Sequence, residues 1–117
     1  MMIGEVCLET NDVIRLADFY RRLLALADSN ENEDSVHQFI ITEGTTLTVY
    51  NDGRPKNNQN QNISLAFTVE DVDVEYERLI KLGIPVIDPP KLQPWGVKNM
   101  HLCDPDGNHI YFRSIPQ

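Results

Sequence analysis

The sequence predicts an α+β fold made of two βαβββ modules, whose curled mixed sheets enclose a groove. The first observation is an internal repeat, because the strand-and-helix pattern that starts at Glu5 starts again at Ser64, an offset of 59 residues (64 − 5). The second observation is a pair of turn glycines, Gly44 and Gly107, at equivalent places 63 residues apart (107 − 44). One helix covers only one face of a sheet, so two such sheets curled toward each other form a concave ligand site.

The first half of the chain has the pattern of one strand, one amphipathic helix and a hairpin. A side-chain oxygen of Asn11 or Asp12 can accept a free N–H group at the start of the helix, and the helix is expected to end near Ala27. Glu43 and Gly44 supply the turn of the hairpin. Strands are expected at 3–9, 36–42 and 45–51.

The second half repeats this plan. Glu70 or Asp71 caps a helix, and Gly83 followed by Pro85 ends it. Five turn-forming residues, 104–108, join the last two strands. The inner stripe of the helix is expected to consist of Val72, Tyr76, Leu79 and Ile80. Strands are expected at 63–69, 84–87, 97–103 and 109–113.

The 117 residues are enough for one domain, which we place at 1–117. Its first module is expected at 1–52 and its second module at 63–115. Between them, 53–62 is polar and has no apolar period, so this segment is predicted to be an exposed linker.

The composition limits the classes of partner. Ten Lys and Arg stand against 18 Asp and Glu, which gives a formal net charge of −8. That balance argues against nucleic acid and against an anionic membrane surface, and it suits a cationic or neutral small molecule. No apolar segment is long enough to cross a bilayer, and no secretory signal is visible. The two cysteines, Cys7 and Cys103, fit no zinc or redox spacing, so we expect a cytoplasmic protein with both thiols reduced.

Several motifs together resemble the vicinal oxygen chelate superfamily, which holds glyoxalases, bleomycin-resistance proteins, extradiol dioxygenases and fosfomycin-resistance enzymes. The most specific motif is the DPDGN turn at 104–108, followed by His109 and Ile110. The other motifs are found at 18–20, 67–72, 81–86 and 94–98. The resemblance covers nearly the whole chain and implies the paired-module fold, a homodimer and a U-shaped groove. It implies little about the reaction, because this superfamily hosts many chemistries.

Metal-dependent members of that superfamily place four inward ligands in the groove, mostly His and Glu, from the first and last strands of each half. Under this resemblance, strand alternation identifies the four equivalent positions here. They are Glu5, Thr48, Ser64 and Tyr111. One carboxylate, two hydroxyls and a phenol are a poor ligand set for a catalytic divalent ion, so we expect no metal there and disfavour Zn, Ni, Mn or Fe as cofactors.

Glu5 and His101 are the candidate catalytic residues. Glu5 is either a general base or cation anchor, or a strand-end carboxylate that faces water. His101 alternates with two apolar residues and is expected to face the groove, as an acid, a base or a hydrogen-bond partner, or else as a packed or dimer-contact histidine. His109 is interpreted as a solvated strand end, and the facing of His37 is left open. Spacing alone does not support a metal site built from Glu5, His101 and a cysteine thiolate.

Aromatic residues complete the candidate site. Tyr50 and Tyr111 can stack on a flat ligand, although ordinary sheet packing also explains them. Trp95, the single tryptophan, is expected in a loop over the mouth of the groove, as a ligand lid or a dimer contact. Cys7 and Cys103 are interpreted as inert strand residues, because no activating partner is visible.

The favoured function is a metal-independent homodimer that binds a small organic molecule, as the bleomycin-resistance branch does. The expected ligand-binding residues are Glu5, Thr48, Tyr50, Ser64, Trp95, His101 and Tyr111. The alternative is a metal-dependent glyoxalase-type lyase or isomerase, in which Glu5 removes a proton next to the carbonyl group of a small substrate and His101 or Tyr111 stabilises the oxyanion. A third reading is an interaction or sensor module without catalytic activity.

Overall fold

The structure is a computed structural model, and it describes residues 1–26, 34–56 and 62–116. The chain divides into two compact units, Met1–Asn57 and Asn58–Gln117, which we call unit 1 and unit 2. The division falls within the expected linker 53–62, of which residues 57–61 lie outside the described residues. Among the helices of the described residues, none has the length and apolar character needed to cross a membrane.

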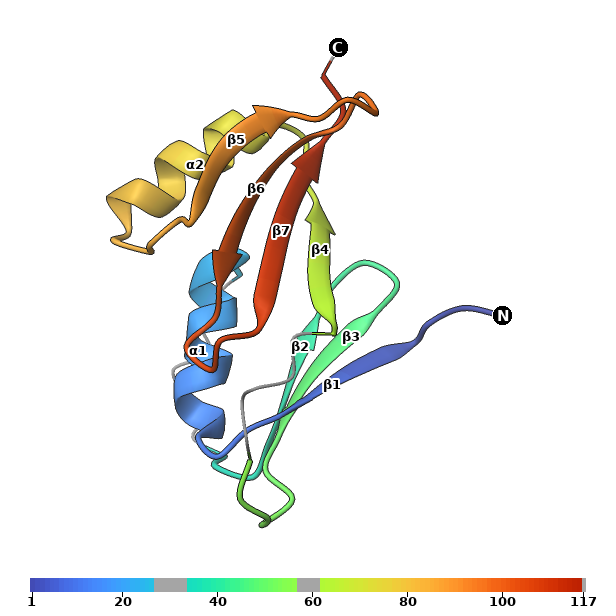
Figure 1. Cartoon of the computed structure of the whole chain (residues 1–117). Coiled ribbons are helices and arrows are strands. Elements are labelled where there is room, and N and C mark those ends of the chain that lie inside the picture. Colours follow the sequence, from blue (N-terminus) through green and yellow to red (C-terminus); the bar gives the residue numbers. More distant parts are fainter. Residues whose placement is uncertain (27–33, 57–61, 117) are drawn as a thin grey trace. The chain divides into compact units, whose positions relative to one another are not determined.

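Unit 1 is a three-stranded sheet with one helix. Its elements are β1 (Glu5–Glu9), α1 (Val13–Leu23), β2 (His37–Ile41) and β3 (Thr46–Tyr50). The strand order is β1-β3-β2, with β1 parallel and β2 antiparallel to β3 (Figure 1). The described residues of this unit therefore have a βαββ order, and residues 27–33 between α1 and β2 lie outside them.

Local contacts set both ends of α1. The Asp12 carboxylate accepts the Arg15 N–H at 3.1 Å, so Asp12 rather than Asn11 is the N-cap. The helix ends at Leu23, and the expectation that it would reach Ala27 is wrong. The reason is the backbone of Ala25, which takes a φ of 53° in the left-handed region and therefore cannot continue a right-handed helix.

The core of unit 1 lies between α1 and one face of the sheet. The inner stripe of the helix is buried as its spacing predicts: Val13, Leu16, Ala17, Tyr20 and Leu23. The strands add Ile40, Leu47 and Val49, together with the polar Gln38. Arg21 of the helix donates to the Gln38 side-chain oxygen, so this buried amide keeps a hydrogen-bond partner.

Unit 2 is a complete βαβββ module. Its elements are β4 (Ser64–Thr68), α2 (Val72–Lys81), β5 (Asp88–Leu92), β6 (Lys98–Cys103) and β7 (His109–Ser114). The strand order is β4-β7-β6-β5, with β4 parallel to β7 and the other pairs antiparallel, and α2 contacts β5, β6 and β7 (Figure 1). The α+β class is thus confirmed, and β1 and β4 start at the predicted offset of 59 residues (64 − 5).

The second helix starts and ends where the sequence predicts. Asp71 is its N-cap and accepts the Asp73 N–H at 2.9 Å, while Ser114 on β7 accepts the Val72 N–H at 3.1 Å. Gly83 follows the helix with a φ of 75°, a left-handed conformation that glycine adopts without strain.

The predicted inner stripe of α2 is correct in three of its four members. Val72 and Leu79 are fully buried, and Tyr76 is half-buried. The inclusion of Ile80 is wrong, since its side chain is 50% exposed. Ile80 follows Leu79 directly, and consecutive residues point about 100° apart around a helix, so Ile80 lies at the edge of the stripe that Leu79 centres.

The strand expected at 84–87 is wrong. The structure has β5 at Asp88–Leu92, which includes Pro89 and Pro90. Prolines are tolerated in β5 because it is an edge strand that pairs only with β6. On the outer side of an edge strand, no neighbouring strand needs the N–H group that proline lacks. The register shifts between Asp88 and Lys91. Ile84 is buried in the connection instead, with its N–H donating to the Leu79 carbonyl at 3.0 Å.

Candidate functional site

Each sheet has one face covered by its helix and a second face turned away from that helix, which we call the open face. In unit 2, strand alternation separates the two faces sharply. The helix-facing residues of β6 and β7 are at most 1% exposed: Met100, Leu102, Ile110 and Phe112. The residues between them point to the open face, as do their register partners on β4: Ser64, Ala66, Asn99, His101, Cys103, His109 and Tyr111.

Three potential metal-binding side chains meet on this open face, and we call them the His-Cys cluster: His101, Cys103 and His109. The register pairs Cys103 directly with His109, and His101 lies two residues before Cys103 on the same strand face. His101 Nε2 lies 2.8 Å from His109 Nδ1, and Cys103 Sγ lies 3.8 Å from the same Nδ1. The three potential ligand atoms all lie within 4.8 Å of one another.

Two neighbours hold the His101 ring in place. The Asp88 carboxylate, on the adjacent strand β5, lies 3.1 Å from His101 Nδ1. The Tyr111 ring stacks on the His101 ring with centroids 4.7 Å apart and planes 16° apart. The ring nitrogen opposite the Asp88 contact therefore points at His109, and His101 itself is 14% exposed at its side chain.

The Cys103 thiol is not activated as a nucleophile. Burial raises the pKa of Cys103, and the neighbouring Asp104 carboxylate raises it further. Burial likewise raises the pKa of Cys7 on β1, with added contributions from Glu5 and Glu9. Both groups therefore stay protonated at neutral pH unless a cation binds to the sulfur, because a nucleophilic cysteine needs a lowered pKa.

Unit 1 carries different chemistry on its open face. Thr48 is only 2% exposed, and its hydroxyl donates to Glu5 Oε2 at 2.6 Å. His37, whose orientation the sequence does not predict, points to this same face. Its ring centroid lies 4.3 Å from that of Phe39 and 5.1 Å from that of Tyr50. The face thus combines one carboxylate held by a hydroxyl with a group of three rings.

The structure brings some of the predicted site residues together within each unit. Glu5 and Thr48 are in contact in unit 1, and Tyr111 and His101 are in contact in unit 2. Ser64 lies opposite His109 in the β4–β7 pair, so it belongs to the same open face as the His-Cys cluster. Their roles in binding stay predictions.

Trp95 does not lie with the His-Cys cluster. It is 70% exposed in a short turn that the Gln93 N–H closes onto the Val97 carbonyl at 2.8 Å. The loop that the sequence predicts at 89–97 is shorter in the structure, because β5 extends to Leu92. Trp95 adjoins the start of β6, whereas Cys103 ends that strand.

The sequence pattern does not identify two residues of this site, one inside the His-Cys cluster and one beside it. His109 was expected to be a solvated strand end, but it is half-buried and lies against His101. The sequence pattern does not identify Asp88 as a site residue, because the strand expected at 84–87 ends one residue before it. The spacing contained a usable signal for His109, since a five-residue turn between Cys103 and His109 places these two residues opposite each other.

The four positions that correspond to the ligands of metal-dependent superfamily members do not fit a catalytic metal. Glu5 supplies the one carboxylate, and its Oε2 already accepts a hydrogen bond from Thr48. Ser64 and Tyr111 supply neutral oxygens. Divalent catalytic ions in proteins are held by carboxylates, imidazoles or thiolates, so neither the pair in unit 1 nor the pair in unit 2 supplies the donors that such an ion prefers.

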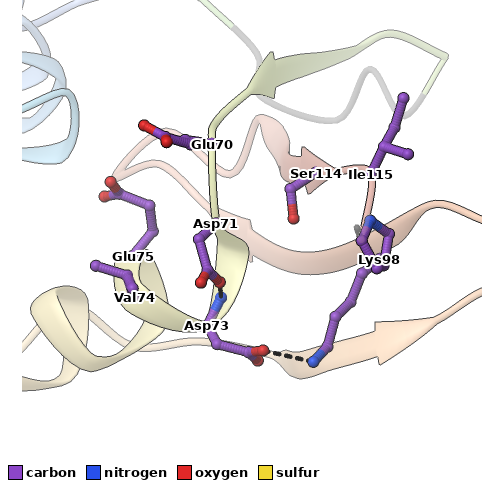
Figure 2. Close-up of a pocket in the computed structure, with 9 residues that line it drawn as sticks. Glu70, Asp71, Asp73, Val74, Glu75, Lys98, Ser114 and Ile115 are labelled. Carbon is purple, nitrogen blue, oxygen red and sulfur yellow. Dashed lines mark hydrogen bonds and ion pairs between the residues drawn. The ribbon is translucent and has the colours of Figure 1, made fainter.

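A separate hollow of about 660 Å³ lies beside the start of α2 (Figure 2). Four carboxylates border it: Glu70, Asp71, Asp73 and Glu75. Asp71 is used as the helix cap, Asp73 forms an ion pair with Lys98 (Figure 2), and Glu75 forms an ion pair with Arg78, so three of the four already have partners. None of the predicted site residues lines this hollow.

Comparisons with known proteins extend the resemblance that the motifs indicated. A model of the Glyoxalase/Bleomycin resistance protein/Dioxygenase superfamily matches residues 2–112. The comparison with curated proteins gives no match.

Solved structures show the same fold at low identity. TioX from Micromonospora sp. ML1 matches with a TM-score of 0.76 and 21% identity, over 99% of this chain and 100% of that chain. A glyoxalase/bleomycin resistance protein/dioxygenase family enzyme from Burkholderia phytofirmans PsJN matches with a TM-score of 0.79 and 15% identity, over 99% and 100%. A lactoylglutathione lyase from Agrobacterium tumefaciens matches with a TM-score of 0.71 and 20% identity, over 96% and 92%. At such identities the likeness concerns the fold.

Proposed function

We propose a function from one premise: the chain belongs to the Glyoxalase/Bleomycin resistance protein/Dioxygenase superfamily, whose model matches residues 2–112. The proposed function is binding of a small organic molecule by a cytoplasmic homodimer, without a catalytic metal at the four superfamily ligand positions. The observation that carries it is the donor set at those positions, in which Glu5 is the one charged group and is hydrogen-bonded to the Thr48 hydroxyl at 2.6 Å.

Charge and ring chemistry define the proposed class of ligand. The chain carries a net charge of −8, and Glu5 places one carboxylate on the open face of unit 1. Such a face attracts a cation and repels an anion. On the same face of unit 1, Tyr50 offers a ring for a flat ligand. On the open face of unit 2, Tyr111 offers a ring and the Ser64 hydroxyl offers a hydrogen bond. An aromatic cation therefore suits the face of unit 1 better than an anionic compound does.

The alternative function is that of a glyoxalase-type lyase or isomerase. The Asp88 contact to His101 favours it, because an aspartate that holds one ring nitrogen fixes the tautomer of the other and prepares a histidine for proton transfer. Turnover of methylglyoxal hemithioacetal, with added Ni²⁺ or Zn²⁺, tests this alternative directly. A rate no higher than that of buffer excludes it for this substrate.

Isothermal titration calorimetry tests the binding proposal. Metal-free bleomycin, ethidium and acridine orange are titrated into the chain before and after treatment with EDTA, which is then removed. At least one probe is expected to bind, with the same Kd before and after. Binding that appears only with added Zn²⁺ or Ni²⁺, or no binding by any of the three probes, contradicts the proposal.

A matched pair of variants locates the binding. Glu5→Gln removes the carboxylate of the proposed anchor, and it is expected to weaken binding of a cationic probe by about tenfold, which corresponds to about 1.4 kcal/mol. Glu43→Gln removes an equal charge from the exposed β2–β3 turn and is expected to leave the Kd unchanged. Equal effects of the two variants would mean that net charge alone attracts the probe.

A further inference from the structure

We propose that His101, Cys103 and His109 bind one zinc ion on the open face of unit 2, through residues other than the four superfamily ligand positions, two of which, Ser64 and Tyr111, lie beside these three. Their potential ligand atoms all lie within 4.8 Å of one another, and each residue comes from a paired strand of one sheet. Two imidazoles and one thiolate are the donor types that zinc prefers. This site goes beyond the small-molecule binding proposed above and does not depend on it.

The distances suit a tetrahedral ion after a small adjustment. Zinc bonds of about 2.0–2.1 Å to nitrogen and about 2.3 Å to sulfur require ligand separations of about 3.3 Å between two nitrogens and about 3.6 Å between nitrogen and sulfur. Here His101 Nε2 and His109 Nδ1 are 2.8 Å apart, and Cys103 Sγ is 3.8 Å from His109 Nδ1. These two separations therefore change by about half an ångström or less, and Cys103 Sγ, which lies within 4.8 Å of His101 Nε2, moves toward that nitrogen by up to about 1.2 Å.

Asp88 supplies the outer contact that histidine ligands of zinc commonly have. Its carboxylate lies 3.1 Å from His101 Nδ1, which leaves Nε2 as the nitrogen that faces the cluster. Carboxylates placed in this way fix the ring and raise its basicity toward the metal. Tyr111, stacked at 4.7 Å, limits tilting of the same ring. Both ring nitrogens of His101 are therefore assigned, one to the carboxylate and one to the ion.

The short contact between the two histidines is itself compatible with a cation site. Two ring nitrogens 2.8 Å apart form a hydrogen bond in which one nitrogen carries the hydrogen and the other accepts it. Because His101 Nδ1 faces the Asp88 carboxylate, the hydrogen lies on His109 Nδ1 when both rings are neutral. On zinc binding, this hydrogen moves to the other nitrogen of the His109 ring, and the proton of the Cys103 thiol is released to solvent. The charge of the ion offsets the burial that keeps this thiol protonated in the free protein.

The donor types select among metals. A thiolate and two imidazoles are unsuited to Mg²⁺ and Ca²⁺, which take oxygen ligands. Three protein ligands leave one position of a tetrahedral zinc open, as in catalytic rather than structural zinc sites. Water or an oxygen or nitrogen atom of a small molecule can fill that position. Ser64 on β4 lies opposite His109 on the same open face.

Cobalt titration tests this site without any organic ligand. Co²⁺ binds zinc sites and reports them in colour, because a thiolate ligand gives a charge-transfer band and a tetrahedral site gives intense visible bands. Protein stripped with a chelator, and then freed of it, is expected to take up one Co²⁺ per chain with both signals, and Zn²⁺ is expected to abolish them by displacement. Absence of both signals at saturating Co²⁺ overturns the proposal.

Matched variants assign the ligands. Cys103→Ser is expected to remove the charge-transfer band, whereas Cys7→Ser, at the other cysteine, leaves it unchanged. His109→Gln is expected to weaken zinc binding at least tenfold, and His37→Gln to leave it unchanged. Asp88→Asn is expected to weaken it by about 10–100-fold, as loss of such an outer contact does. A band that survives in Cys103→Ser, or disappears in Cys7→Ser, overturns the assignment.

Circular dichroism tests whether a variant loses metal binding because it is misfolded. The stripped variants are compared with the stripped parent chain, and matching spectra and melting temperatures mean that lost metal binding reflects lost ligands. His109→Cys provides a second check, because it keeps a zinc ligand at this position and is expected to retain cobalt binding with a stronger charge-transfer band. A His109→Cys chain that matches the parent in its spectrum but binds no cobalt contradicts the site.

Discussion

The open face of unit 1 joins a carboxylate to a hydroxyl, with Thr48 Oγ1 2.6 Å from Glu5 Oε2, whereas the open face of unit 2 gathers two imidazoles and a thiol. The helix-facing residues of the same strands differ much less. Leu47 and Val49 on β3 correspond to Ile110 and Phe112 on β7, and all four are buried and apolar. The repeat thus preserves the residues that hold each helix to its sheet, and its two copies differ in the residues that can meet a ligand.

The largest expected loss of stability comes from comparing substitutions on the two faces of one strand, β7. Phe112→Ala removes a fully buried ring that packs edge-to-face on Phe67, and it is expected to lower the free energy of unfolding by about 3–5 kcal/mol. Tyr111→Ala, on the open face one residue earlier, is expected to cost clearly less. Urea unfolding of the two variants measures the difference. Equal losses would mean that Tyr111 also belongs to the core.

The next effect concerns the paired groups of unit 1. Thr48→Val keeps the side-chain shape and removes the hydroxyl that donates to Glu5, so it is expected to lower stability by about 1–2 kcal/mol. Thr46→Val is the matched control on the same strand and face, because the Thr46 hydroxyl makes no hydrogen bond within the part of the chain that the structure describes. If both variants unfold at the same urea concentration, the Thr48 hydrogen bond contributes nothing.

The two helix caps allow a closer comparison. Asp12→Ala is expected to cost about 1 kcal/mol, the usual effect of losing an N-cap. Asp71→Ala is expected to cost less, because Ser114 also accepts an N–H at the start of α2. Thermal unfolding of both variants, and of Asp71→Ala combined with Ser114→Ala, checks this. The account fails if the combined change is no more destabilising than Asp71→Ala alone.

The smallest effect is a pH dependence in unit 1. Lys56 and Arg54 hold the pKa of Asp52 well below its usual range, through side-chain and backbone hydrogen bonds. A lowered folded-state pKa stabilises the fold above the unfolded pKa of about 3.9, and this contribution is lost as the pH falls through the folded pKa. Asp52→Asn is therefore expected to lower the melting temperature slightly at pH 7, and the difference is expected to vanish in strong acid. A difference that persists in strong acid contradicts the assignment.

Much of the fold could be predicted from the sequence, because the hydrophobic periodicity of helices and strands and the residue types of turns are local features. The alternation of Leu47 with Thr48, and of Ile110 with Tyr111, was enough to assign each to its face. The edge strand β5 was missed, since two consecutive prolines argue against a strand unless its position at the sheet edge is known.

The candidate site was harder to predict than the fold. Contacts such as Asp88 with His101 depend on which residues pair across strands, and a wrong strand boundary removes them. The alternation of residues along β6 shows which face His101 occupies, but it does not show that Asp88 and His109 contact the His101 ring. The charge of −8 could be read directly, because it needs no register, whereas the donor set at the superfamily positions depends on the facing that strand alternation gives each residue.

A crystal soaked in ZnCl₂ and measured on both sides of the zinc absorption edge tests the central claim most directly. The account predicts an anomalous peak bounded by His101 Nε2, Cys103 Sγ and His109 Nδ1, and no such peak against the Glu5 carboxylate. A zinc peak that touches Glu5 or Tyr111, with none among the two histidines and the cysteine, would contradict both the weak donor set and the proposed zinc site.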